Sequence, residues 1–259
     1  MAFFDFMAPP AHKPELPAEK VKSTYTAMRW KVFIGIYLGY AAYYLVRKNL
    51  SFAGADMVAQ TEAQELAEKG FLTSSCCPAF VQYIKSAFPN LVDHISHNMS
   101  PMAVLGKYIK ETAPDSKVIF IGPCTAKKAE AQLESVKPYI DSVLTFEELQ
   151  ALFDSRDFDL STFEEGVLDN ASYFGRIFAR SGGLTDAAVQ AMKEQNIDFE
   201  IKPVVCDGIE ACRMALLKLS KSQAALGGNF IEGMACIGGC IGGAGCLTHG
   251  EKNKAEVDK

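Results

Sequence analysis

One stretch near the C-terminus constrains this chain more than any other. Residues 232–246 read EGMACIGGCIGGAGC, so three cysteines are interleaved with six glycines. Glycine permits close backbone approach and positive φ angles, and thiolates are soft ligands for iron–sulfur clusters, zinc or Cu(I). The stretch therefore predicts a loop folded tightly around a metal group, with backbone N–H groups facing its negative charge. The alternative is a glycine-rich turn whose cysteines are simply buried.

Five further cysteines bear on that choice. The total of eight is even, but no secretory signal is recognisable, and a chain of 259 residues can bury a core without disulfides. We therefore expect reduced thiols and a cytoplasmic location. The net charge of −5 argues against a nucleic-acid partner, which would need a basic face. These five residues are Cys76, Cys77, Cys124, Cys206 and Cys212.

Four of the cysteines come from three separate predicted loops, and four thiolates are what a 4Fe–4S cluster requires. Zinc held by four thiolates is the main chemical rival, but the chain lacks the usual pair of Cys-x2-Cys knuckles. Cys206 and Cys212 are expected to be small buried hydrophobic residues. The candidate cluster ligands are Cys77, Cys124, Cys236 and Cys240.

The pattern after residue 54 predicts an α/β fold. Thr145 and Glu148 form a capping box, and alternation of strands with helices implies sheets with parallel pairing. In such folds sites form beyond strand ends, where Cys124, Cys206 and Cys236 lie. The predicted strands cover 117–121, 139–144, 199–206 and 230–235, and the predicted helices cover 61–69, 78–88, 101–112, 184–195 and 208–219.

The N-terminal part has a different character. Residues 1–29 contain four prolines and are expected to be irregular. Val32–Val46 then gives fifteen uncharged residues, fewer than the ~20 of a full membrane span, and Arg47 and Lys48 follow it. The segment 30–48 is therefore expected to form either a membrane-like helix or a buried or interfacial one.

Residues 8–53, with ELPAEKVKSTYTAMRWKVFIGIYLGYAAYYLVRKN, resemble the start of glycerol-3-phosphate transporters of the major facilitator superfamily. The resemblance implies a substrate-phosphate role for Arg47, with Tyr40 and Tyr44 near it. It covers one membrane helix of twelve, so no transport pathway can be built from this chain. At the abrupt junction near 53–54, a genuine fusion and an assembly error would look alike.

Three later motifs, in matching order, resemble the signatures of FeFe hydrogenases. They are TSSCCPAF at 73–80, PCTAKKAE at 123–130 and EGMACIGGC at 232–240, and GRIFARSGG at 175–183 extends the likeness. The resemblance runs over about 54–250 and implies two small sheets flanked by helices around a cluster site. The expected organisation is thus a transporter-like segment 1–53, a hydrogenase-like domain 54–250 and a charged tail 251–259.

The resemblance also implies roles for single residues. The four candidate ligands would hold the 4Fe–4S part of an H-cluster, and Cys240 would bridge to a diiron unit carrying CO, cyanide and azadithiolate. Cys76 would pass protons, Lys127 would hydrogen-bond a cyanide, and Met234 and Phe178 would line the diiron pocket. Without the motif around it, Lys127 would be predicted to be a solvated helix lysine, and Glu62 and Glu65 would be predicted to be surface carboxylates on a helix. The residues implied on the proton path are Ser96, Glu62 and Glu65, with Cys246 as an extra thiol that is a cluster neighbour, a relay or simply buried.

The motifs also depart from the family pattern. Gly122 replaces the usual methionine, Met102 a glutamine and Phe80 a tryptophan, and the last motif ends in Cys246. The N-terminal portion of the family's catalytic domain and its ferredoxin-like clusters are absent. His94 and His97, three residues apart, could share a helix face as a metal pair but fit a polar surface patch better.

We therefore expect a divergent, truncated hydrogenase domain for reversible proton reduction or hydrogen sensing. One alternative is a non-catalytic 4Fe–4S protein, and a second is a transporter fragment. The expected partners are a redox protein such as ferredoxin, or a signalling partner, and the hydrogenase maturation proteins. The segment 30–48 adds the expectation of a tether to the cytoplasmic membrane.

Overall fold

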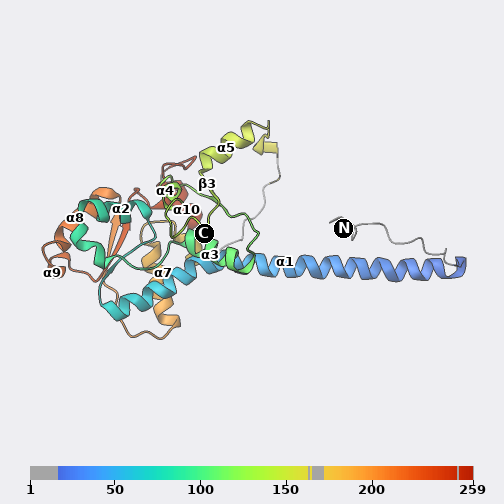
Figure 1. Ribbon diagram of the computed structural model, residues 1–259, viewed down its shortest axis with the longest axis horizontal. Coiled ribbons are helices and arrows are strands. Elements are labelled where there is room, and N and C mark those ends of the chain that lie inside the picture. Colours follow the sequence, from blue (N-terminus) through green and yellow to red (C-terminus); the bar gives the residue numbers. More distant parts are fainter. Residues whose placement is uncertain (1–16, 163, 165–171, 250, 259) are drawn as a thin grey trace. The chain divides into compact units, whose positions relative to one another are not determined.

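The computed structural model describes residues 17–162, 164, 172–249 and 251–258 (Figure 1). Within these ranges the side chains at 18, 19, 21, 32, 35–54, 56, 251, 252 and 256 are left out of the description. The chain divides into two compact units, Met1–Arg47 and Lys48–Lys259. Each unit is described by itself below.

Helix α1, Ala18–Lys69, contributes to both units. The prediction of an irregular segment is wrong for residues 18–29, which are helical, and residues 1–16 lie outside the described residues. The predicted helix at 61–69 is helical and ends at Lys69 as predicted, but it is the last part of this longer helix. The sequence of α1 contains no proline, and its isolated glycines each cost only about 1 kcal/mol in a helix. In the first unit Tyr25, Trp30 and Phe33 are exposed.

The segment 30–48 lies within α1. In the described part of the chain, no helix combines the length and the apolar character needed to cross a membrane, so the membrane-like helix expected here is not supported. The side chains of Tyr40, Tyr44 and Arg47, for which the transporter resemblance implies roles, lie outside the description.

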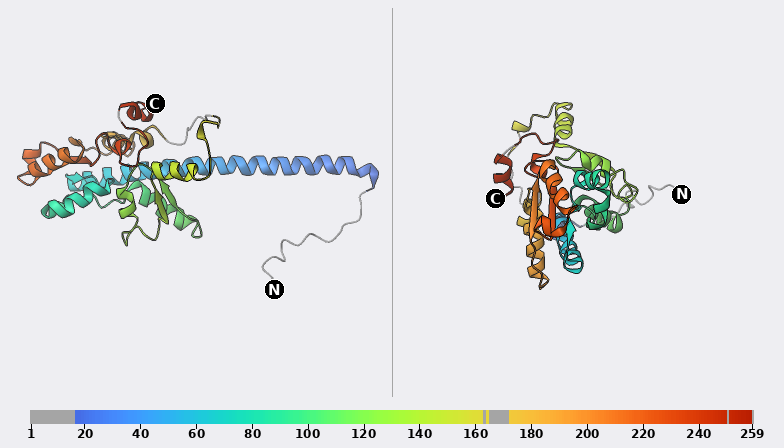
Figure 2. Two further views of the ribbon diagram at one scale, coloured as in Figure 1. Left: turned by 90° about the horizontal axis from the view of Figure 1, so that it is seen from above. Right: turned by 90° about the vertical axis from the view of Figure 1, so that its left-hand side faces the viewer.

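The second unit contains two small parallel sheets (Figures 1 and 2). The first has the order β1-β5-β4, formed by Leu72–Thr73, Phe230–Met234 and Pro203–Asp207. In its register Leu72 and Pro203 both lie opposite Phe230. The second sheet pairs β2, Ile119–Ile121, with β3, Ser142–Leu144. The predicted α/β fold with small parallel sheets is therefore confirmed.

Helices connect and cover these strands. Helix α3 has its predicted bounds, and the predicted capping box at the start of α5 is present, with Thr145 and Glu148 each bonding the other's backbone. The short strand β1 was missed, since two residues carry no periodic signal. The remaining elements are α2 (Pro78–Ala87), η2 (Pro89–His94), α3 (Pro101–Thr112), α4 (Ala126–Glu130), α5 (Phe146–Asp154), η3 (Leu160–Thr162), α6 (Tyr173–Ile177), α7 (Gly183–Glu194), α8 (Ile209–Leu219), α9 (Gln223–Leu226), η4 (Cys240–Gly242) and α10 (Glu251–Val257).

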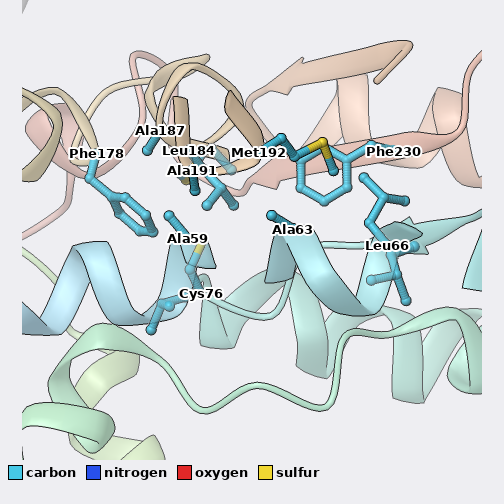
Figure 3. Packing of buried hydrophobic residues seen from close by; sticks show 13 residues of the cluster. Ala59, Ala63, Leu66, Cys76, Phe178, Leu184, Ala187, Ala191, Met192 and Phe230 are labelled. Carbon is cyan, nitrogen blue, oxygen red and sulfur yellow. The ribbon is translucent and has the colours of Figure 1, made fainter. Parts of the chain in front are cut away.

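Buried side chains form three core clusters in the second unit. The first lies between α1, α7 and β5 (Figure 3), the second packs α2 and α8 against β5, and the third lies around α3 and β3. Strand β5 separates the first two, because successive side chains of a strand point to opposite faces. The first cluster comprises Val58, Ala59, Ala63, Leu66, Leu72, Cys76, Phe178, Leu184, Ala187, Ala191, Met192, Phe230 and Met234.

Candidate metal centre

The four candidate ligand cysteines line one cavity of about 90 Å³. The structure thus brings together residues that are up to 163 positions apart in the chain (240 − 77). Its other walls are mostly small and apolar, including Ala79, Ala126 and Met234. The thiols are Cys77, Cys124, Cys236 and Cys240, all of them free.

Each cysteine follows a strand. Cys77 comes after β1 and is the N-cap residue of α2, Cys124 comes after β2, and Cys236 comes after β5. Because β1 and β5 are parallel neighbours, their carboxyl ends meet at one edge of the sheet. The thiol of Cys77 makes no capping hydrogen bond, so it stays free for ligation.

Glycines allow the cysteine loop, defined as residues 236–246, to pack closely on its neighbours. A Cβ on Gly242 would lie 1.9 Å from the carbonyl oxygen of Ile237, and one on Gly243 would lie 2.6 Å from that of Pro123. The N–H of Gly245 donates to the same Pro123 carbonyl at 2.8 Å. The glycines therefore serve close backbone packing, which places Cys236 and Cys240 opposite the loop of Cys124.

The cysteine loop has two faces. Cys236, Gly239, Cys240 and Gly243 face the thiol cavity, whereas the residues between them line a second cavity of about 430 Å³. One layer of backbone therefore separates the thiols from this outer cavity. The outer cavity is lined by Ile237, Gly238, Ile241 and Gly242 of the loop, and by Arg180, Ser181, Asp207, His249 and Lys254.

The thiol cavity favours the protonated form of Cys236 and Cys240. Burial, and then the proximity of Cys77 and Cys124, raise the pKa of Cys236, and the same causes raise the pKa of Cys240 to about 12. A metal group would displace these protons and relieve the repulsion between thiolates. Four soft donors around an apolar void fit a 4Fe–4S cluster. In the described residues no three His, Cys, Asp or Glu side chains converge as ligands of a single metal ion.

Three residues implied for a diiron pocket, Cys76, Phe178 and Met234, belong to the first core cluster. Figure 3 shows Phe178, Ala59 and Cys76 next to one another. Met234 belongs to the same cluster and also lines the thiol cavity. Burial, and then the charge of Glu62, raise the pKa of the Cys76 thiol.

Lys127 is buried, with 7% of its surface exposed. Its ammonium group pairs with Glu130 at 2.7 Å and donates to the backbone carbonyl of Cys76 at 3.3 Å. The interpretation of Lys127 alone as a solvated helix residue is therefore wrong. The buried ion pair places a cation close to Cys76, and these two contacts use only part of the hydrogen-bonding capacity of an ammonium group.

Glu62 is only 1% exposed, so its interpretation as a surface carboxylate is wrong. Both carboxyl oxygens are buried and have no hydrogen-bond partner among the described residues. Burial, and then the charges of Glu232 and Glu65, raise its pKa to about 8, against weaker effects of the Ser75 N–H and the Ser96 hydroxyl. Glu62 is therefore protonated at neutral pH.

Glu65 has the opposite environment. It accepts hydrogen bonds from the Ser96 hydroxyl at 2.8 Å and from Lys69 at 2.8 Å, and it lies 2.6 Å from His97 Nδ1. Partial burial raises its pKa, but these partners outweigh burial and lower the pKa to about 2.

The prediction that His94 and His97 lie on one face of a helix is wrong, because η2 ends at His94.

The remaining thiols lie outside the cavity lining. Cys206 and Cys212 are buried, as predicted, and they contact each other through their thiols. Cys246 is also buried, and its thiol lies 3.3 Å from the carbonyl oxygen of Ile241. Burial fits the third of its interpretations, and its roles as a cluster neighbour or a relay stay predictions.

Glu232 was missed as a functional candidate. It is fully buried on β5, and its carboxylate accepts three hydrogen bonds from Gly182 and Thr185. A charged residue within the buried strand FIEGM was the available signal, since a buried carboxylate needs compensating partners.

The family model described as "Iron only hydrogenase large subunit, C-terminal domain" matches residues 50–244. Iron hydrogenase 1 of Clostridium pasteurianum is 29% identical over 251 residues, covering 79% of this chain and 44% of that protein. A cytosolic Fe-S cluster assembly factor of Eremothecium gossypii is 34% identical over 136 residues, covering 50% of this chain and 29% of that protein.

The transporter resemblance is also found. The glycerol-3-phosphate transporter of Haemophilus influenzae is 46% identical over 72 residues, covering 28% of this chain and 15% of that protein. Among solved structures, an FeFe-hydrogenase of Chlamydomonas reinhardtii has a TM-score of 0.58 at 20% identity, covering 79% of this chain and 71% of that one. This last likeness shows the fold. The chain spans less than half the length of the Clostridium pasteurianum hydrogenase, at 44%.

Proposed function

This chain belongs to the iron-only hydrogenase family whose model matches residues 50–244, and from that premise we propose that it binds a 4Fe–4S cluster. One observation carries the proposal, namely that four free thiols from three loops line one cavity. The proposed ligands are Cys77, Cys124, Cys236 and Cys240. When bound, such a cluster supplies one-electron redox chemistry.

A diiron unit of the H-cluster type is the second part of the proposal. Such a unit, with its CO, cyanide and azadithiolate ligands, would supply the site of reversible proton reduction or hydrogen sensing. In support, Cys76, Phe178 and Met234 belong to the same core cluster, and the buried ammonium of Lys127 donates to the backbone carbonyl of Cys76. A cation in a dry pocket stabilises an anionic ligand through charge-assisted hydrogen bonds.

Protons would reach Cys76 through buried side chains. Burial raises the pKa of Glu62 to about 8, and its ionised form is among the causes that raise the pKa of Cys76, while Ser96 donates to Glu65 nearer the surface. The series Cys76, Glu62, Ser96 and Glu65 therefore offers groups that can hold and pass a proton from solvent to the pocket. His97, which is exposed and in contact with Glu65, lies at its outer end.

A non-catalytic cluster protein is the second candidate. The similarity to a cytosolic Fe-S cluster assembly factor favours it, as do the departures at Gly122 and Met102 from the pattern of active hydrogenases. In this case the chain would hold the cubane without the diiron unit. The ligand cysteines are the same in both candidates, so spectroscopy separates them.

The partners follow from the same proposal. A cytoplasmic redox protein such as ferredoxin, or a signalling partner, would exchange electrons with the cluster, and hydrogenase maturation proteins would install a diiron unit. The outer cavity lies one backbone layer from the thiols and is the proposed point of approach.

The testing experiment is infrared and iron analysis of the chain produced anaerobically with the hydrogenase maturation proteins. About four iron and four sulfide per chain are expected for the cubane. Sharp CO and cyanide stretching bands would support the diiron unit, and iron and sulfide without these bands would support the non-catalytic candidate. A chain without iron, or with zinc instead, would contradict both.

Two alanine variants in the same loop sharpen the test. Cys236→Ala removes a proposed ligand and should lose most of the bound iron, whereas Cys246→Ala removes a buried thiol outside the cavity and should keep it. Equal iron contents in the two variants would contradict the ligand assignment.

A further inference from the structure

Glu232 lies in the middle of β5 on the face of the first core cluster. Phe230 and Met234, two positions on either side, belong to that cluster, and a strand repeats its facing every two residues. On the other face, a Cβ on Gly233 would lie 2.3 Å from the ring of Phe80. The Glu232 side chain therefore shares a face with Met234, which lines the thiol cavity.

The carboxylate is satisfied by donors from α7. Oε1 accepts from the N–H of Gly182 at 2.8 Å, and Oε2 accepts from the N–H and the hydroxyl of Thr185 at 2.9 and 2.6 Å. Gly182 is the N-cap residue of α7 and has no side chain for capping, so Glu232 caps this helix from another element. Burial raises the pKa of Glu232, and the hydrogen bonds from Thr185 and Gly182 oppose that rise because they stabilise the ionised form.

The hydrogen bonds of Glu232 hold the turn that follows residues 179–181, and these residues contact the cysteine loop. Residues 179–181 immediately precede the capped turn, and Ile241 donates to the carbonyl of Ala179 at 3.2 Å while Ser181 donates to that of Gly238 at 3.3 Å. A Cβ on Gly239 would lie 2.7 Å from the nitrogen of Ser181. Segment 179–181 therefore backs the loop that carries two of the proposed ligands.

A second observation concerns charge. The negative charge of Glu232 is among the causes that raise the pKa of Glu62, so the two carboxyls lie close enough in the core to interact. Glu62 has no hydrogen-bond partner among the described residues, whereas Glu232 has three. Of the two buried carboxyls, Glu232 is therefore the one whose ionised form is stabilised by hydrogen bonds.

We propose that Glu232 is a positioning residue with a fixed negative charge, which clamps segment 179–181 behind the cysteine loop and lowers the reduction potential of a cluster bound there. The second part rests on the proposed function. A fixed anion in a poorly screened interior disfavours the addition of an electron nearby. The clamp is a property of the chain itself and needs no cluster.

The charge is tested by redox titration, followed by electron paramagnetic resonance, of the full chain with its reconstituted cluster. Glu232→Gln removes the charge and should shift the midpoint potential to a more positive value. Thr185→Val removes one donor but keeps the charge, so its midpoint potential should equal that of the parent chain. Equal potentials in all three proteins would overturn the electrostatic role.

The clamp is tested by amide hydrogen exchange on the same proteins without iron. Thr185→Val and Glu232→Gln should both exchange faster than the parent chain at Ser181 and at Gly182–Thr185. Unchanged exchange there would overturn the clamp. If Glu232→Gln fails to fold, Glu232→Asp replaces it in the exchange measurement, and the shortened carboxylate should also speed exchange.

The two measurements separate this inference from the proposed function. A parent chain that binds no cluster contradicts the proposed function and the electrostatic role together, while the exchange measurement still decides the clamp. A cluster that binds normally, with an unchanged potential in Glu232→Gln, contradicts the electrostatic role alone.

Discussion

Glu62 and Glu65 are three residues apart on α1, yet their environments give them opposite charge states at neutral pH. Burial without a hydrogen-bond partner among the described residues raises the pKa of Glu62 to about 8. The hydrogen bonds of Lys69, His97 and Ser96 outweigh burial and lower that of Glu65 to about 2. The difference arises from the depth of burial and the hydrogen-bond partners of each carboxyl, and it makes two separate predictions about pH.

Glu62 should make the iron-free chain less stable as pH rises. Its pKa is about 8 when folded and 4.5 ordinarily, so between these values the folded state keeps a proton that the unfolded state releases. The free energy of unfolding should fall across this window by at most about 1.4 kcal/mol per pH unit. Urea unfolding between pH 5 and 8, in steps of about one unit, measures it. Glu62→Gln should remove this slope, and an identical slope in the variant would refute the assignment.

Glu65 should have the opposite effect on stability, because it should lower the free energy of unfolding as pH falls below 4.5. Its pKa is about 2 when folded, so its contribution is present above 4.5 and is lost as pH falls toward 2. Glu65→Gln should therefore weaken the acid sensitivity of unfolding below pH 4.5 and leave the slope between pH 5 and 8 intact. Acid titration followed by circular dichroism checks this, and a variant as acid-sensitive as the parent chain would count against it.

At the scale of elements, strand β5 contributes side chains to two core clusters and leads directly into the cysteine loop. Its even-numbered residues face the first core cluster, and its odd-numbered residues face the second. The close contact of Gly233 with Phe80 lets α2, which begins next to Cys77, lie directly on the strand. A side chain at 233 would push α2 away from the thiol cavity.

Gly233→Ala should therefore destabilise the second unit, by about 1–3 kcal/mol as in other overpacked cores. The added Cβ would lie 2.3–2.4 Å from three ring atoms of Phe80. Denaturant unfolding measures the loss. The double variant Gly233→Ala with Phe80→Leu should cost less than the sum of the single variants, whereas simple additivity would show that the two residues do not press on each other.

At the scale of the molecule, the described core and the thiol cavity belong entirely to the second unit, Lys48–Lys259. The described residues of the transporter-like part of α1 supply no member to any of the three core clusters. The later part of the same helix supplies Val58, Ala59, Ala63 and Leu66 to the first.

Removal of residues 1–47 should therefore leave iron binding and the unfolding midpoint nearly unchanged. Removal of residues 1–66 takes four core residues with it and should abolish cooperative unfolding, because each buried apolar side chain lost costs about 2–5 kcal/mol. Iron analysis and thermal unfolding of both shortened chains test this. Loss of iron on removal of 1–47 would give the first unit a role that the described contacts do not.

The sequence by itself determined the local features of this protein. The Cys–Gly spacing of 236–246, the capping box of Thr145 and Glu148, and helix α3 were predicted because each depends on residues within a few positions of one another. The α/β class followed from alternating periodicities, and the family from three motifs. These signals survive without knowledge of distant contacts.

Only the tertiary structure decided which distant side chains meet. It alone places four thiols around one cavity, buries Glu62 with no hydrogen-bond partner among the described residues and gives Glu232 its three donors from α7. It also continues α1 from Ala18 to Lys69, where composition predicted separate segments. Burial and hydrogen-bond partners set the charge of a carboxyl group, and they depend on packing between elements far apart in the chain, which no local pattern records.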